Sequence, residues 1–247
     1  MSRVIEVVND AEAVSLAAAK RVVMAAQQAI AERGSFSIAL SGGSTPKRLY
    51  QHLASNVFCD QIEWSKVRIF FGDERTVAPD HADANFRMAS EAMLDQLPIP
   101  ASQIHRMQGE LADLEQAAAS YAEALQLLPQ KSGFPEFDLV LLGMGDDGHT
   151  ASLFPGTTAL SERDKSVVAL EVPQLNTCRI TLSYPVINNA RQVMLLVAGA
   201  GKAEQLEQVL VSAPVGSFPV QEVTPQGELI WLLDEGAAAQ LPKAMLA

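Results

Sequence analysis

The sequence predicts one α/β domain over residues 1–247, built on a mostly parallel central sheet with helices on both faces. Several short segments are apolar almost throughout, as strands buried on both faces of a parallel sheet are. Segments with helical periodicity alternate with them along the chain. With 247 residues, 48% of them hydrophobic, the chain can bury one large core.

The predicted elements follow in the order that such a sheet requires. Asp10 can cap a helix that runs to about Arg33, and Gly34 can end it in the left-handed conformation. Pro46 suits the first turn of a second helix, which continues to about Ser55. Further helices are predicted at 85–96, 111–128, around 187, 202–211 and 236–247. Strands are predicted at 36–40, 67–71, 137–142, 167–172, 179–183, 193–198 and 229–233, with a short one at 104–107.

Composition restricts the class of partner. The chain has 18 basic and 29 acidic residues, a net charge of -11, which argues against a broad surface for nucleic acid or anionic membrane. No apolar run approaches the roughly 20 residues that span a bilayer, so we expect a soluble, cytoplasmic protein. Cys59 and Cys178 form no CxxC motif, and we expect both to be buried, unreactive thiols.

Three predicted strands end in glycine and polar residues: SGGST follows Leu40, GDER follows Phe71 and GMGDDGH follows Leu142. Because the carboxyl ends of parallel strands meet at one edge of a sheet, we expect the three turns on the same rim. The longest, within residues 137–156, concentrates glycine, carboxylates, hydroxyls and a histidine. We interpret it as the active-site loop.

The SGGST turn has the composition of a phosphate site. Gly42 and Gly43 let the backbone turn tightly, while Ser44 and Thr45 add hydroxyls at the start of a helix. An ordinary helix cap is the alternative. Lys202, at the start of a later helix, either supplies a cation to the same phosphate or is a solvated surface lysine.

The GDER turn places charged side chains directly after a buried strand. Arg75 either pairs with a neighbouring acid or faces the pocket and stabilises a negative oxygen. In the second case Asp73 would orient Arg75 or a neighbouring histidine.

The segment GMGDDG matches the dinucleotide pattern GxGxxG. We exclude that reading, because Asp146 and Asp147 would stand where a pyrophosphate binds and Pro155 leaves room for barely one helical turn. His149 is more informative, since an imidazole can act as a general base near neutral pH. A hydrogen-bonded structural histidine is the alternative.

The loop before the third predicted helix contains Asp80, His81, Asp83 and Asn85, which resemble a metal cluster. They lack the spacing of a calcium loop and have no second histidine for zinc. We therefore expect no metal site, and a solvated loop in which Asp83 or Asn85 caps the next helix.

Taken together, SGGSTPKRLY, FFGDERTVAPDHADANFRM, LLGMGDDGHTASLFPG and the region RITLSYPVINNAR to VMLLVAGAGKAE resemble the 6-phosphogluconolactonase family, over about residues 4–233. The resemblance implies a NagB-like, modified Rossmann-type fold. It also implies hydrolysis of 6-phospho-D-glucono-1,5-lactone to 6-phospho-D-gluconate in the oxidative pentose phosphate pathway, without a cofactor. The expected partner is thus a small phosphorylated sugar lactone, and we expect a monomer or weak homo-oligomer.

The resemblance also assigns roles to individual residues. It implies that His149 is the general base that activates water, with Arg75 and Asp73 beside it in the catalytic site. The oxyanion would be stabilised by Arg75 or by backbone amides of the turn that contains Gly143, Gly145 and Gly148. The residues implied to bind the phosphate or the rest of the substrate are Gly42, Gly43, Ser44, Thr45, Lys202 and Arg179.

Two other functions compete with the lactonase. The related isomerase and deaminase branch resembles FNMDEY where this chain has FFGDER, and GHIAFNEP where it has GHTASLFPG. Arg75 in place of tyrosine suits a lactone oxyanion, and the glutamate expected to assist ring opening is missing after His149. A non-enzymatic sugar-phosphate sensor is the alternative from another class.

Overall fold

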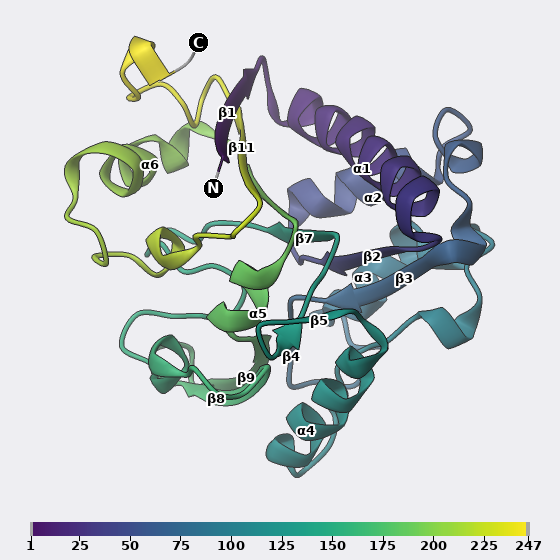
Figure 1. Ribbon diagram of the computed structural model, residues 1–247. Coiled ribbons are helices and arrows are strands. Elements are labelled where there is room, and N and C mark those ends of the chain that lie inside the picture. Colours follow the sequence, from purple (N-terminus) through teal and green to yellow (C-terminus); the bar gives the residue numbers. More distant parts are fainter. Residues whose placement is uncertain (1, 246–247) are drawn as a thin grey trace.

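The computed structural model describes residues 2–245 and confirms the α/β architecture (Figure 1). Its central sheet has six strands in the order β1-β11-β10-β7-β2-β3, and each neighbouring pair is parallel. The strands are β1 (Ser2–Val8), β2 (Phe36–Leu40), β3 (Val67–Phe71), β7 (Leu139–Leu142), β10 (Gln192–Val197) and β11 (Glu228–Asp234).

Side chains of this sheet alternate between two cores. In β7, Leu139 and Leu141 enter one core, while Val140 and Leu142 enter the other. The first face is covered by α1 (Ala11–Arg33), α2 (Ser44–Ala54) and α3 (Asn85–Ala92). The second is covered by α4 (Leu114–Ala124), α5 (Tyr184–Asn189) and α6 (Ala203–Glu207). Burial on both faces explains why these strands read as apolar throughout.

A second, antiparallel sheet has the order β4-β9-β8 and was not predicted. It consists of β4 (Asp73–Arg75), β9 (Thr177–Leu182) and β8 (Val167–Val172). Gly72 joins the two sheets, because its N–H donates to Leu40 at 2.8 Å and its carbonyl accepts from Leu182 at 2.8 Å. The DER segment is therefore a strand rather than a turn, stabilised by pairing with residues a hundred positions away.

Several predicted boundaries are confirmed and others are wrong. Asp10 Oδ1 accepts from the N–H of Ala13 at 2.8 Å, and Gly34 ends α1 at a φ of 80°. The strand β1 was missed, and the helix predicted at 202–211 is α6 followed by a π-helix, Gln208–Ser212. The helix predicted at 236–247 is wrong for the described residues, which form turns and one short 3-10 segment, while 246–247 lie outside them.

The remaining elements are short. A hairpin of β5 (Gln130–Lys131) and β6 (Phe134–Pro135) precedes β7. The 3-10 turns are Cys59–Gln61, Trp64–Lys66, Leu94–Gln96, Ala101–Gln103, Leu125–Leu127, Thr158–Ser161, Pro173–Leu175, Ala200–Lys202, Pro219–Glu222 and Lys243–Met245. No helix within residues 2–245 is long and apolar enough to cross a membrane. Cys59 and Cys178 are free thiols, each half-buried instead of fully buried.

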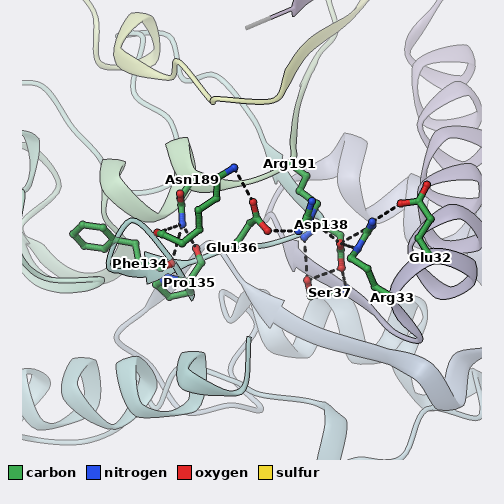
Figure 2. A network of polar contacts seen from close by, with 10 residues as sticks. Glu32, Arg33, Ser37, Phe134, Pro135, Glu136, Asp138, Asn189 and Arg191 are labelled. Atoms are coloured by element: carbon green, nitrogen blue, oxygen red, sulfur yellow. Dashed lines mark hydrogen bonds and ion pairs between the residues drawn. The ribbon is translucent and has the colours of Figure 1, made fainter. Parts of the chain in front are cut away.

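A polar network anchors the start of β7, as Figure 2 shows. Asp138 Oδ2 accepts from the backbone N–H and the hydroxyl of Ser37, at 2.8 and 2.9 Å. Its Oδ1 accepts from Arg33 Nε at 3.1 Å. Arg191 joins Asp138 to Glu136, which is 5% exposed and also pairs with Lys131. The network fixes β7 against β2 at the end of the sheet opposite the functional loops.

Replacing Asp138 with alanine should lower the free energy of unfolding by about 2–4 kcal/mol. The change leaves the Ser37 N–H without its acceptor. It also deprives Arg33 and Arg191 of a carboxylate partner whose side chain is only 13% exposed. Glu32→Ala is the matched control, because Glu32 pairs with the same Arg33 but is 49% exposed, and a surface pair contributes about 0–1 kcal/mol. Urea unfolding measures both variants, and equal midpoints would contradict the anchoring role.

Candidate active site

A cavity of 580 Å³ lies at the carboxyl ends of β2, β3 and β7. It brings together the three turns predicted to share a rim. Its wall is formed by Ser41, Gly42, Gly43, Asp73, Arg75, Asn85, Gly143, Met144, Gly145, Asp146, Asp147, His149, Thr150, Ala151, Ser152, Phe154, Gln174, Leu175 and Arg179. The β8–β9 hairpin contributes the last three residues, so both sheets build the site.

The turn between β2 and α2 presents backbone to the cavity. Gly43 precedes α2 at a φ of 107°, a conformation that favours glycine, and no side chain caps this helix. Ser44 and Thr45 form its first turn but are outside the cavity lining. Tyr50 fixes the turn, because its hydroxyl donates to the Ser41 carbonyl at 2.7 Å and accepts from the Ser41 N–H at 2.9 Å.

Lys202 lies at the rim, on the 3-10 turn that follows β10. Its ammonium group pairs with the carboxylate of Asp146, a residue of the active-site loop whose side chain is 90% exposed. The structure therefore joins Lys202 to the active-site loop without making it part of the cavity wall. An exposed partner is easily exchanged for a bound anion.

Glu74, from the DER segment, caps the N-terminus of α3. Its carboxylate accepts from the N–H groups of Asn85 at 2.7 Å and Phe86 at 2.8 Å, and from that of Arg75 at 2.8 Å. Burial raises the pKa of Glu74, against the effect of the three N–H donors. The expectation that Asp83 or Asn85 would cap this helix is wrong, because a carboxylate from another element occupies that place.

Asp73 is held by neighbours other than those expected. It is 8% exposed, and its Oδ2 accepts from the hydroxyl of Ser152 at 2.7 Å. Its Oδ1 and its backbone carbonyl accept from Asn85 Nδ2, at 3.3 and 3.0 Å. The expectation that Asp73 orients Arg75 or the histidine is wrong, since neither is among its hydrogen-bond partners within residues 2–245. Asp73 still lines the cavity.

Arg75 and Arg179 stand opposite each other in the antiparallel sheet, so both side chains project from the same face. Arg75 donates to the backbone carbonyl of Asp83, and Arg179 donates to Thr177 Oγ1 at 2.9 Å and to the Cys178 carbonyl at 2.8 Å. Within residues 2–245, neither guanidinium forms an ion pair with a carboxylate. Burial, followed by the charge of Arg75, lowers the pKa of Arg179. Two cations without an ion-paired carboxylate among the described residues thus line the cavity, an arrangement that favours an anionic ligand.

His149 is oriented by Asp147, two residues before it. The ring nitrogen Nδ1 lies 2.6 Å from Asp147 Oδ1, and the ring stacks on Phe154 with centroids 4.0 Å apart. Burial alone would raise the pKa of Asp147, but the backbone and ring N–H groups of His149 outweigh it and hold the pKa below its ordinary value. A carboxylate only accepts, so the proton resides on Nδ1. Nε2 is then free to accept a proton.

Two glycines of this loop are required by close contacts. A Cβ on Gly145 would lie 2.0 Å from His149 Nδ1, and one on Gly148 would lie 2.8 Å from the Phe218 side chain. Their amides donate to the carbonyls of His149 at 2.9 Å and Gly145 at 3.1 Å. These amides already serve the turn, so the two glycines position His149 and are not available to stabilise an oxyanion. A Cβ on Gly143 would contact nothing within 4 Å.

The sequence analysis missed three polar residues of the site. Asp147 was noted only as an obstacle to a pyrophosphate, although a carboxylate two positions before a histidine is within reach of its Nδ1. Ser152 belonged to the predicted loop without a role, and Asn85 was considered only as a helix cap or as a member of a metal cluster. The roles of Ser152 and Asn85 depend on contacts with Asp73 from another strand, for which the sequence carries no local signal.

Comparisons with known proteins agree on one family. The family model for glucosamine-6-phosphate isomerases/6-phosphogluconolactonase matches residues 9–231. The chain is 48% identical to a 6-phosphogluconolactonase from Synechocystis over 217 residues, which cover 87% of this chain and 88% of the relative. It is similar to the solved 6-phosphogluconolactonase from Trypanosoma brucei, with a TM-score of 0.86 and 31% identity over 98% of this chain and 99% of the other. A monomeric glucosamine-6-phosphate deaminase of the NagB superfamily matches with a TM-score of 0.80 and 20% identity over 97% of this chain and 100% of the other, which confirms the NagB-like fold.

The Asp147–His149 contact predicts the tautomer of the neutral ring. Nitrogen-15 NMR of the protein should find the proton of His149 on Nδ1, because Asp147 can only accept it. In Asp147→Ala the proton should move largely to Nε2. A wild-type ring protonated on Nε2 would contradict the assigned orientation.

Proposed function

The chain belongs to the glucosamine-6-phosphate isomerase/6-phosphogluconolactonase family, and we propose that it hydrolyses 6-phospho-D-glucono-1,5-lactone to 6-phospho-D-gluconate with His149 as the general base. Its likeness to lactonases supports the class of lactone hydrolase. The observation that carries the proposal is one cavity containing a histidine with a free Nε2 and two arginines without carboxylate partners.

The phosphate would bind where the backbone and helix α2 offer donors. Gly42 and Gly43 let the turn approach a ligand closely, and the first amides of α2, at Ser44 and Thr45, have no side-chain cap. The Lys202 ammonium group would leave its ion pair with Asp146 and bind the phosphate instead. These contacts fix the ring of the lactone, so that its carbonyl carbon is held against His149.

The proposed chemistry is addition of water followed by ring opening. His149 Nε2 removes a proton from water as the water oxygen bonds to C1, while Asp147 stabilises the imidazolium that results. Arg75, a cation in the cavity wall without an ion-paired carboxylate within residues 2–245, stabilises the oxyanion at C1, whereas the amides of Gly145 and Gly148 are engaged in the turn. The bond between C1 and the ring oxygen then breaks, and the imidazolium returns the proton to that oxygen. The new carboxyl group releases its proton to solvent.

Asp73 and Arg179 support this reaction without exchanging protons in it. The Asp73 carboxylate keeps Ser152 and Asn85 in place in the cavity wall. Arg179 adds positive charge on the same face as Arg75, where it can contact the anionic substrate.

The reaction itself is tested by stopped-flow proton release from freshly generated lactone, with the uncatalysed rate subtracted. Wild type should accelerate release, and His149→Ala should lose about 10²- to 10⁴-fold in kcat, because it lacks the general base. Binding of 6-phosphogluconate to the variant should stay near normal by calorimetry. Full activity in His149→Ala would end the general-base proposal, and ammonia release from glucosamine 6-phosphate by wild type would favour the deaminase branch.

Lys202→Ala should raise KM and weaken binding of 6-phosphogluconate by roughly 10- to 100-fold, because a charge-assisted contact to the phosphate is lost. The matched control is Lys165→Ala, since Lys165 also pairs with an exposed carboxylate, that of Glu115, but Glu115 is not a residue of the cavity wall, as Asp146 is. The control should bind as wild type does. An unchanged KM in Lys202→Ala would remove Lys202 from the phosphate site.

A further inference from the structure

Asn85 is a buried polar residue in the cavity wall whose position is fixed from two sides. It is the first residue of α3 and 3% exposed. Its backbone N–H donates to Glu74 Oε1 at 2.7 Å. Its side-chain Nδ2 donates to the carbonyl of Asp73 at 3.0 Å and to Asp73 Oδ1 at 3.3 Å.

These partners determine which way the amide of Asn85 faces. A backbone carbonyl only accepts hydrogen bonds, so the NH₂ group has to face Asp73. The oxygen Oδ1 then faces Gly42, and a Cβ built on Gly42 would lie only 2.1 Å from this oxygen. No group within residues 2–245 donates to Oδ1. A side-chain acceptor that the protein leaves without a donor, in the wall of a cavity, is normally satisfied by water or by a ligand.

We propose that Asn85 Oδ1 accepts a hydrogen bond from a ring hydroxyl of the sugar lactone and thereby selects the substrate. The proposal rests on the lactonase function. Phosphate oxygens that carry no proton and the lactone carbonyl only accept, so Oδ1 repels them, and the hydroxyls are the donors that the substrate offers. Gly42 belongs to the turn proposed to bind the phosphate. The matching hydroxyl is therefore the one on C4, the ring hydroxyl nearest to the phosphorylated C6.

This role differs from a purely structural one in what it predicts. If Asn85 only held Asp73 in place, its loss would slow all lactones by the same factor. If the Asn85 oxygen accepted a hydrogen bond from the attacking water, its loss would also slow all lactones by the same factor. If Asn85 instead accepts a hydrogen bond from the C4 hydroxyl, the effect of its loss depends on whether the substrate carries that hydroxyl. Measuring wild type and variant with both the full substrate and the 4-deoxy analogue isolates this interaction.

The test compares kcat/KM for 6-phosphogluconolactone with that for its 4-deoxy and 2-deoxy analogues. Wild type should prefer the full substrate over the 4-deoxy analogue by about 10- to 100-fold beyond the difference in uncatalysed rates, because the analogue leaves Oδ1 unpaired. Asn85→Ala should lose most of that preference and leave the preference over the 2-deoxy analogue unchanged.

Ser152→Ala is the matched control, because it removes the other side-chain donor to Asp73 and leaves the Asn85 oxygen in place. It should slow all the lactones equally and keep the preference for the C4 hydroxyl. If Asn85→Ala fails to fold, Asn85→Ser replaces it, since the Glu74 cap on α3 uses the backbone N–H of this residue.

The outcomes separate this inference from the proposed function. An undiminished preference for the C4 hydroxyl in a folded Asn85 variant overturns the inference, and so does a loss of preference confined to the 2-deoxy analogue. Failure of wild type to accelerate hydrolysis of any of the lactones would instead overturn the lactonase proposal.

Discussion

Parallel pairing of β7 with β2 and β10 is the constraint on which the site depends. Parallel neighbours end at the same edge of the sheet, so the segments that follow β2, β3 and β7 lie next to one another. The chain secures this arrangement at the opposite edge, where Asp138 binds the backbone and hydroxyl of Ser37. The apolar residues of β7 and β10 then supply the burial, and the polar residues lie at the two ends of these strands.

The antiparallel sheet contributes the two arginines of the cavity wall, Arg75 and Arg179. Gly72 bonds to both sheets, and the next three residues of the chain serve three purposes. Asp73 holds Ser152 and Asn85, Glu74 caps α3, and Arg75 stands beside Arg179 in the cavity. One short strand thus connects a helix, a loop and a neighbouring strand to the same pocket, in a chain of net charge -11.

Local signals predicted the sheet and the rim, and tertiary contacts decided the rest. The strands at 36–40 and 67–71 were predicted to the residue, because continuous apolar runs mark burial on both faces. The strand β4 was missed, because three polar residues form a strand only through their pairing with β9. The choice of Asp147 over Asp73 as the partner of His149 required the geometry of the loop. The helix predicted at 236–247 was wrong because the prediction relied on the alanine-rich composition and gave too little weight to Gly236 and Pro242, which disfavour a helix.

A crystal structure of the protein with 6-phosphogluconate tests the central claim most directly. The account predicts the phosphate on the turn of Gly42 and Gly43 near Lys202, and the C1 carboxylate about 2.6–3.2 Å from His149 Nε2. In that orientation the Asp147–His149 pair can act on water at C1. A product bound in reverse, with its phosphate against His149 and its carboxylate on the glycine turn, would contradict the account.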